Sequence, residues 1–515
     1  MHAIAYSDIR RPSGAQPLDR ARTRRVLIGA AALLIAVLAV PASPFAVGEA
    51  EAKSSRRHAE NKSKRRNIEA ALERARRRTI PAKAATAAKP AGNPSAPNPA
   101  PASVGDRAAI PSPQTAAGAK AADEALEPKL TLPEMRAAVL AAPHGELARI
   151  GHHVIVGYHN ASQLFPLIER GAIGGVFVTA RNARGRTKSA LAAEIARFRA
   201  RAEAAGQKPF WITTDQEGGS VSRLSPPLPR QPSLGRLLAA TTAPEARGPA
   251  VADFAARQAG ALAEIGVNLN FAPVADLNLD AKAARDRHTR VRHRALSSDP
   301  GLVAEAARIY CEALLSHSVA CTLKHFPGLG RVIADTHPTS ATLKTPQEVL
   351  ATTDWVPFRQ VIDATPAAVM IGHPHLASVD SEARPASTSP AGIGGIVRKG
   401  FGFDGVVITD DLALGAIKKR KGGMARAAVE AIGAGADLVL VGLDGDHVYG
   451  VLYALLDAVR SGEISKEKLE ISKKRLQRLK NSMDSAALAG SNSSPAQTPQ
   501  PLEVVSPELG KTVQR

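Results

Sequence analysis

The sequence predicts an α/β fold, a TIM-type (β/α)8 barrel that forms a single catalytic domain with disordered N- and C-terminal tails. Composition changes sharply near residue 128, where a basic and then Ala/Pro-rich region ends. Between residues 128 and 483, eight short apolar runs alternate with helical patterns. Polar side chains directly follow several of these runs, which is typical of barrel enzymes, whose catalytic groups lie at the carboxyl ends of the strands.

Residues 1–48 have the pattern of an export signal or a membrane anchor. Four arginines between residues 20 and 25 precede Val26–Val40, a run of fifteen residues without a charged or polar side chain. A cleaved secretory signal and an uncleaved anchor formed by residues 26–47 both fit this pattern. In either case we expect an exported catalytic domain, periplasmic or extracellular.

Residues 49–127 read as a linker, because a basic and then Ala/Pro-rich segment cannot bury enough apolar surface to offset the cost of ordering it. Residues 1–125 contain 21 Lys and Arg against 10 Asp and Glu, so +11 of the formal charge of +20 lies there. A solvated tail is the commoner explanation for such charge, and binding to a membrane surface or to anionic cell-wall polymers is the alternative. No nucleic acid is expected, because no aromatic residues lie among the basic ones. Residues 484–515 are Ser/Ala/Pro/Gln-rich, which predicts a disordered tail.

Eight apolar runs are the candidate barrel strands. Several are β-branched and flanked by glycine, as in buried parallel strands joined by right-handed crossovers. Helical patterns such as Ser189–Ala204 and Pro249–Glu264 lie between them, and Ile471–Lys480 reads as the helix that closes the barrel. The runs are His153–Gly157, Gly175–Thr179, Phe210–Thr214, Asn268–Pro273, Cys321–Phe326, Ala368–Gly372, Gly405–Thr409 and Asp437–Gly442.

Polar residues at the ends of these runs indicate one functional rim. In a barrel, the carboxyl ends of all strands meet on the same face, so we expect these side chains to converge there. They are Asp215, Asp276, Lys324, His325, His373 and Asp410.

The segment Thr322–Thr342 carries further candidate chemistry, with Asp335 and His337 two residues apart in a Gly/Pro-rich loop. A carboxylate at this spacing can orient the imidazole and set its tautomer and basicity, so the pair could transfer protons near neutral pH. Farther along, an apolar run ends in the adjacent carboxylates Asp410 and Asp411, of which we expect the second to cap the following helix.

These motifs resemble glycoside hydrolase family 3, in particular its NagZ-like β-N-acetylhexosaminidases. The resemblance extends from about Pro143 to Lys480 and rests on KHFPG, on the D-x-H triplet and on TDDL. Further matches in the same order include GGVFVTARN, TTDQEGGSVSRL, LNFAPVADLN and RPASTSP. Two positions depart from the family pattern: Leu329 replaces a histidine, and Ser220 replaces an arginine.

The resemblance implies a retaining enzyme that removes terminal GlcNAc from peptidoglycan fragments or related oligosaccharides. It assigns the nucleophile to Asp410 and the acid/base function to a dyad of His337 and Asp335. It implies no cofactor and no metal, and we expect a monomer. Two alternatives stay open: a catalytically inactive cell-wall glycan-binding protein, and a β-N-acetylglucosaminide phosphorylase. The resemblance assigns sugar binding to five residues: Asp215, Arg223, Arg294, Lys324 and His325.

The chain has two cysteines, Cys311 and Cys321, and neither stands in a CxxC or His/Cys metal-binding spacing. We expect both to be small buried packing residues. A disulfide between them is left open, because the sequence does not give the geometry.

Overall fold

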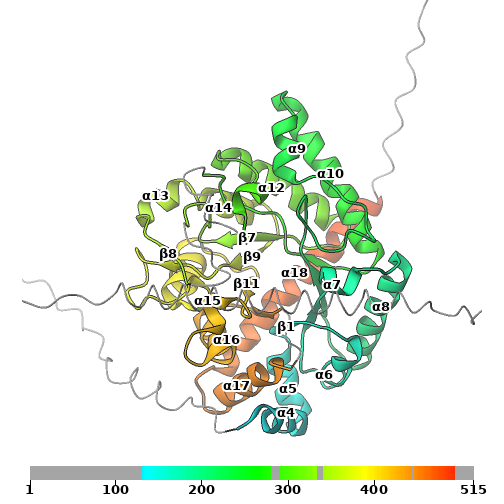
Figure 1. The fold of residues 1–515 in the computed structure, drawn as a ribbon, viewed down its shortest axis with the longest axis vertical. Coiled ribbons are helices and arrows are strands. Elements are labelled where there is room, and N and C mark those ends of the chain that lie inside the picture. Colours follow the sequence, from blue (N-terminus) through cyan, green and yellow to red (C-terminus); the bar gives the residue numbers. More distant parts are fainter. Residues whose placement is uncertain (1–129, 280–288, 333–339, 443–445, 493–515) are drawn as a thin grey trace, which may run out of the picture. The chain divides into compact units, whose positions relative to one another are not determined.

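The computed structural model describes residues 130–279, 289–332, 340–442 and 446–492 (Figure 1). The expected signal or anchor and the linker, residues 1–127, lie outside this range, and so do Asp335 and His337. Within it, no helix combines the length and apolar character that a membrane span requires.

A barrel of eight parallel strands forms the centre of the described chain, as the sequence predicts. In spatial order the strands run β6, β3, β2, β1, β12, β11, β9, β7. Parallel bridges between Leu269 and Ala320 and between Val274 and Lys324 join the first strand to the last and close the barrel. All eight predicted runs are strands of this sheet: β1 (Val154–Gly157), β2 (Gly175–Phe177), β3 (Trp211–Thr214), β6 (Leu269–Asn270), β7 (Thr322–Phe326), β9 (Ala368–Ile371), β11 (Val407–Asp411) and β12 (Leu438–Val441).

Alternating side chains along the strands build two apolar layers, because successive residues of a strand point to opposite faces. Ile155 of β1 belongs to the cluster inside the barrel, together with Trp211 and Phe271. Its neighbours Val154 and Val156 belong to the larger cluster between the strands and the surrounding helices. Strands β1, β2, β3, β9, β11 and β12 contribute to both clusters in this way, which explains why their sequences read as hydrophobic runs, whereas β7 carries the buried polar residues Thr322 and Lys324.

Helices surround the barrel (Figure 1). Several begin at recognisable caps: Thr187 accepts a hydrogen bond from the Ala190 N–H at the start of α8, and Asp299 accepts two at the start of α12. The longer helices are α4 (Leu132–Ala141), α5 (His144–Gly151), α8 (Lys188–Ala204), α9 (Leu234–Ala240), α10 (Pro244–Glu264), α12 (Pro300–Leu315), α13 (Gln347–Thr352), α14 (Val356–Ala364), α16 (Gly423–Ala434), α17 (Val448–Arg460) and α18 (Lys466–Asn492). Shorter ones are α6 (Phe165–Glu169), α7 (Ala180–Ala183), α11 (Val291–Arg294) and α15 (Gly415–Lys418), and the two-stranded sheets pair β4 (Gln216–Gly218) with β5 (Val221–Ser222) and β8 (Thr342–Leu343) with β10 (His375–Leu376).

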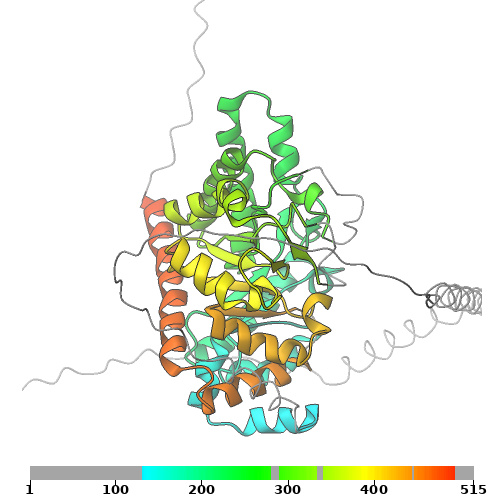
Figure 2. The same cartoon turned by 90° about the vertical axis from the view of Figure 1, so that its left-hand side faces the viewer.

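The last helix, α18, lies across one end of the barrel (Figure 2). Its residues Leu476, Leu479 and Met483 pack against the cluster inside the barrel, so this helix closes one end of the core, as the sequence predicts. It continues to Asn492, nine residues beyond the point where we expected disorder to begin. An ion pair between Lys480 and Asp484, one helical turn apart, supports this extension.

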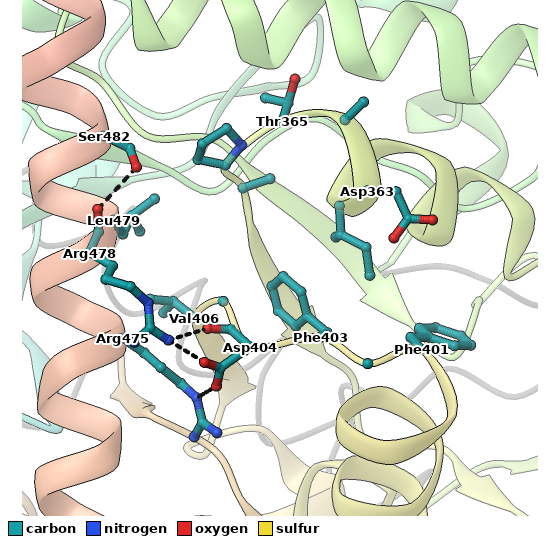
Figure 3. A pocket seen from close by; sticks show the side chains of 16 residues that line it. Asp363, Thr365, Phe401, Phe403, Asp404, Val406, Arg475, Arg478, Leu479 and Ser482 are labelled. Atoms are coloured by element: carbon teal, nitrogen blue, oxygen red, sulfur yellow. Dashed lines mark hydrogen bonds and ion pairs between the residues drawn. The ribbon is translucent and has the colours of Figure 1, made fainter.

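Charged contacts fix α18 to the amino ends of the strands (Figure 3). The Arg475 Nε lies 2.6 Å from Asp404 Oδ1, and the Arg478 Nη2 lies 2.5 Å from Asp404 Oδ2. A cavity of about 380 Å³ adjoins these three side chains, next to the residues that precede β9 and β11. Because both arginines are paired with Asp404, this end of the barrel holds the last helix in place.

A disulfide joins Cys311 of α12 to Cys321, which directly precedes β7, with 5.3 Å between the Cα atoms. Both cysteines are buried in the core, as expected, and the disulfide that the sequence left open is formed. The bond connects a surrounding helix to the strand that carries Lys324 and His325.

Removing this disulfide should destabilise the protein. Replacing both Cys311 and Cys321 with alanine should lower the free energy of unfolding by about 2–3 kcal/mol, because the unfolded chain loses a cross-link between residues ten apart. Urea unfolding with and without a thiol reductant checks this. The reductant should destabilise the wild type and leave the double variant unaffected; equal stability of the oxidised and reduced wild type would contradict the prediction.

Candidate active site

A cavity of about 710 Å³ opens at the carboxyl ends of the barrel strands. Its volume lies within the range typical of small-ligand sites. Apolar walls come from the strands and their extensions, including Phe177, Phe271, Met370 and Leu440. All five residues that we expected to bind substrate line this cavity, and Asp410 lines it with them: Asp215, Arg223, Arg294, Lys324 and His325.

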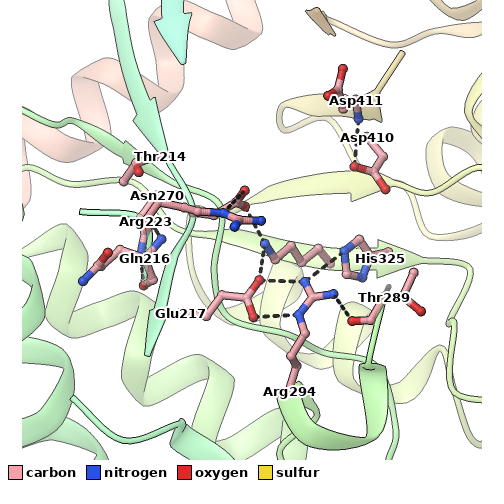
Figure 4. A network of polar contacts seen from close by, with 12 residues as sticks. Thr214, Gln216, Glu217, Arg223, Asn270, Thr289, Arg294, His325, Asp410 and Asp411 are labelled. Atoms are coloured by element: carbon pink, nitrogen blue, oxygen red, sulfur yellow. Dashed lines mark hydrogen bonds and ion pairs between the residues drawn. The ribbon is translucent and has the colours of Figure 1, made fainter. Parts of the chain in front are cut away.

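A buried cluster of charges forms one side of the cavity (Figure 4). Its centre is Glu217 of β4, whose carboxylate accepts two hydrogen bonds from Arg294, at 2.9 Å from Nε and 2.7 Å from Nη2. The Lys324 ammonium lies 2.6 Å from Glu217 Oε1 and 2.8 Å from Asp215 Oδ1. Asp215 lies 3.9 Å from the Arg223 Nε. The cluster therefore joins groups from the β3 end, β4, β7 and α11.

Sequence reasoning missed Glu217, although it stands in the DQEGG motif only two residues after Asp215. Burial alone would raise the pKa of its carboxyl group, but Arg294 and Lys324 hold that pKa well below the ordinary value. In return, Glu217 raises the pKa of Arg294 against the effect of burial. The Arg294 guanidinium is thus held in place and charged before any ligand binds.

His325 is braced by an aspartate. Its Nδ1 lies 2.7 Å from Asp276 Oδ2, and both side chains are buried. The other carboxylate oxygen accepts a hydrogen bond of 2.7 Å from the Leu329 N–H. With Nδ1–H donated to Asp276, the second nitrogen, Nε2, is presented next to the Arg294 Nη2 at 3.4 Å. This arrangement orients the imidazole toward the ligand cavity.

Asp410 and Asp411 end strand β11, and Figure 4 shows them apart from the contacts of Glu217. The Asp411 N–H donates to Asp410 Oδ1 at 2.8 Å, which orients that carboxylate. The expectation that Asp411 caps the next helix is wrong: its carboxylate accepts from the N–H groups of Ala413 and Gly442, so it ties the end of β11 to β12. Burial raises the pKa of Asp411 to about 6, and the charges of Asp410 and Asp215 add to this effect.

Two residues near the rim have structural contacts rather than a place in the cavity lining. Asn182 caps the short helix α7 with Thr179 and donates to the Tyr158 carbonyl at 2.9 Å. His373 lies 2.7 Å from Ser387 Oγ and 3.0 Å from the Asp411 carbonyl oxygen. His373 thereby supports the backbone of the strand end that carries the two aspartates.

Comparison with known proteins identifies the family. A family model described as the glycosyl hydrolase family 3 N terminal domain matches residues 145–479, most of the described chain. The chain belongs to glycoside hydrolase family 3. Curated relatives named beta-hexosaminidase support the same enzyme class: that of Xanthomonas oryzae pv. oryzae is 37% identical over 291 residues, 56% of this chain and 81% of the relative, and that of Xylella fastidiosa is 34% identical over 290 residues, 56% and 81%.

Solved structures agree with this family 3 assignment. A β-N-acetylglucosaminidase of the family from Paenibacillus sp. str. FPU-7 is 30% identical with a TM-score of 0.61, and the match covers 70% of this chain and 66% of that one. A family 3 glycosyl hydrolase from Mycobacterium smegmatis is 31% identical with a TM-score of 0.58, covering 66% of this chain and 98% of that one. The protein is therefore a glycoside hydrolase of the β-hexosaminidase group.

The buried cluster allows a prediction of how the free energy of unfolding depends on pH. Glu217→Gln should lower the free energy of unfolding by about 3–5 kcal/mol, because Arg294 and Lys324 lose their shared counter-charge. The folded pKa of Glu217 is depressed, so its contribution is complete above the ordinary value of 4.5 and is lost as pH falls below it. The variant should therefore lose less stability than the wild type between about pH 4.5 and pH 3.

Urea unfolding across this pH range is the measurement. Glu264→Gln is a matched control, because Glu264 pairs with Lys188 on the surface and both side chains are exposed. Equal pH dependence in wild type and Glu217→Gln would show that Glu217 does not carry the depressed pKa.

Proposed function

We propose that this protein is an exported, retaining β-N-acetylhexosaminidase that removes terminal GlcNAc from peptidoglycan fragments or related oligosaccharides. The observation that carries the proposal is that Asp410, at the end of β11, lines one cavity with a preorganised set of polar groups. A retaining glycosidase needs a carboxylate that can reach the anomeric carbon and a separate group that supplies a proton.

In this proposal the buried cluster binds the hydroxyl groups of the terminal sugar. Lys324 and Arg294 donate hydrogen bonds, whereas Asp215 accepts them, so a hydroxyl that both donates and accepts can be held on two sides. Glu217 and Asp276 fix these groups in place through the contacts described above. Little side-chain ordering is then left to occur when the sugar binds, which favours affinity.

Asp410 attacks the anomeric carbon as the glycosidic C–O bond breaks, and it forms a covalent glycosyl ester. His337, oriented by Asp335, protonates the leaving oxygen and then removes a proton from the water that hydrolyses the ester. Asp335 and His337 lie outside the described residues, so their roles rest on the D-x-H motif. Neutral imidazole regenerated in the first step is the base required in the second.

Separate observations support the proposed substrate and the proposed location. The relatives' names, beta-hexosaminidase and β-N-acetylglucosaminidase, favour an N-acetylated hexosamine at the terminal position. The basic, then apolar segment within residues 1–48 favours export, and the Cys311–Cys321 disulfide is typical of an oxidising compartment. An exported hexosaminidase reaches cell-wall glycans. Neither the phosphorylase nor the inactive binding protein is favoured by these findings.

The nucleophile can be tested with a chromogenic β-GlcNAc glycoside. Asp410→Asn should lower kcat by several orders of magnitude, because the neutral amide cannot form the glycosyl ester. A fluorinated sugar that traps the intermediate should label the wild type on the peptide that contains Asp410, as read by mass spectrometry. Thermal unfolding of the variant controls for misfolding. Wild-type activity in Asp410→Asn, or a label elsewhere, would remove Asp410 from this role.

The acid/base dyad makes a different prediction. Replacing Asp335 or His337 with alanine should reduce kcat/KM most for a natural disaccharide and least for a nitrophenyl glycoside, because an activated leaving group needs little protonation. The double variant should lose no more than His337→Ala alone, since Asp335 then has no imidazole to orient. Losses that ignore the leaving group, or that add in free energy, would assign proton transfer to another residue.

A further inference from the structure

Two asparagines, two positions apart at β6, fasten the two ends of the neighbouring strand β3. At the amino end of β3, Asn268 accepts a hydrogen bond of 2.7 Å from the Ile212 N–H and donates one of 3.0 Å to the Phe210 carbonyl. At the carboxyl end, Asn270 Oδ1 accepts from the Gln216 N–H and Asn270 Nδ2 donates to the Gln216 carbonyl, both at 2.9 Å (Figure 4). Each amide therefore binds backbone groups of the neighbouring segment, as a further strand residue would.

The contacts of Asn270 act on the residue between two carboxylates of the active site. Gln216 stands between Asp215 and Glu217, and both of these carboxylates contact the Lys324 ammonium. Alternate residues of an extended segment point to the same side, whereas the buried Gln216 side chain contacts the segment after β5. Because Asn270 holds both backbone groups of Gln216, a shift of this one segment would move both carboxylates.

Two further buried residues fix the orientation of the Asn270 amide. Its Nδ2 also donates to the Tyr310 hydroxyl oxygen of α12 at 2.9 Å, and the Tyr310 O–H donates to Gln258 Oε1 of α10. A carbonyl oxygen can only accept and an N–H can only donate, so a flipped Asn270 amide would oppose like groups in its contacts with Gln216. Asn270 is completely buried, and a buried polar group that loses its partner is costly.

The network costs stability at its outer end. The Gln258 Nε2 is buried and has no hydrogen-bond partner among the residues that the structure describes. Apolar side chains between the barrel and α10 and α12 would avoid this cost. Within the described part of the chain, the lining of the active-site cavity does not include Asn270, Tyr310 or Gln258. The three residues therefore act on a ligand only through the groups that they hold.

We propose that Asn270 is a positioning residue for sugar binding, which sets the places of the two carboxylates that flank Gln216. This inference rests on the proposed function, in which Asp215 accepts hydrogen bonds from the terminal sugar and Glu217 fixes the cations that donate to it. A displacement of about 1 Å in such a group can lower a rate by about a hundredfold. Tyr310 has a supporting role, because its hydroxyl oxygen fixes the Asn270 amide.

The test is a double-mutant cycle that combines Asn270→Leu with Asp215→Asn. Leucine has the same branching at Cγ as asparagine but no hydrogen-bonding group. The readout is kcat/KM for a nitrophenyl β-GlcNAc glycoside, measured at high enzyme concentration so that slow variants are also quantified, and urea unfolding gives the stability of each variant. The matched control is Asn268→Leu, which removes the equivalent pair of backbone contacts at the other end of β3.

We expect Asn270→Leu to lower kcat/KM by about ten- to a hundredfold in the wild-type background. In the Asp215→Asn background the factor should be clearly smaller, because a group that Asn270 positions is already altered. A merely structural role would give the same factor in both backgrounds. Asn268→Leu should lower the stability but keep kcat/KM within about twofold of the wild type.

An equal or larger loss in the Asp215→Asn background overturns the proposal, and so does a loss in Asn268→Leu as large as that in Asn270→Leu. If Asn270→Leu does not fold, Tyr310→Phe takes its place, because it removes only the hydroxyl group. Its loss of kcat/KM must then show the same dependence on Asp215, and an unchanged kcat/KM overturns the proposal. Absence of hydrolysis by the wild type instead overturns the proposed function, and the role of Asn270 falls with it.

Discussion

The buried pairing of Glu217 with Arg294 and Lys324 is the interaction on which the active site depends. Four ionised groups, these three and Asp215, lie together where water is largely excluded, and each would be costly to bury alone. Pairing them makes the arrangement stable only when β4, β7 and α11 are all in place. The same contacts that connect the barrel strands on this side therefore also hold the hydrogen-bonding groups of the cavity in fixed positions.

The sequence predicts the barrel well and the site in part. Most strands are apolar on both faces, so their runs are visible without knowledge of the partners, and the polar residues at the ends of the runs indicate the rim. Glu217 was missed because its partner Arg294 stands 77 positions away, a distance over which no local pattern operates. The contact of Asp411 with Gly442, 31 positions away, was missed for the same reason. The Cys311–Cys321 bond was left open because the sequence does not give the distance between the two side chains.

Similar ionic contacts have different roles at the two ends of the barrel. At the amino end, Arg475 and Arg478 are both taken up by Asp404, and the contacts fasten α18 across the core. At the carboxyl end, the paired groups line a cavity that is nearly twice as large, and their remaining hydrogen-bonding capacity faces it. What distinguishes the active end is therefore the presence of unused donors and acceptors beside Asp410, since arginine–aspartate pairs occur at both.

The adjacent carboxylates of β11 have different surroundings and therefore different roles. Burial raises the pKa of Asp411 to about 6, above its ordinary 3.8, so the folded state retains a proton there that the unfolded chain has released. This contribution to stability is complete below about pH 4 and is lost as pH rises toward 6. Over that range a neutral Asp411 adds no negative charge beside Asp410, while its backbone N–H still orients the Asp410 carboxylate. One strand end thus supplies the proposed nucleophile and the group that positions it, and below about pH 6 the electrostatic repulsion between the two carboxyl groups is small.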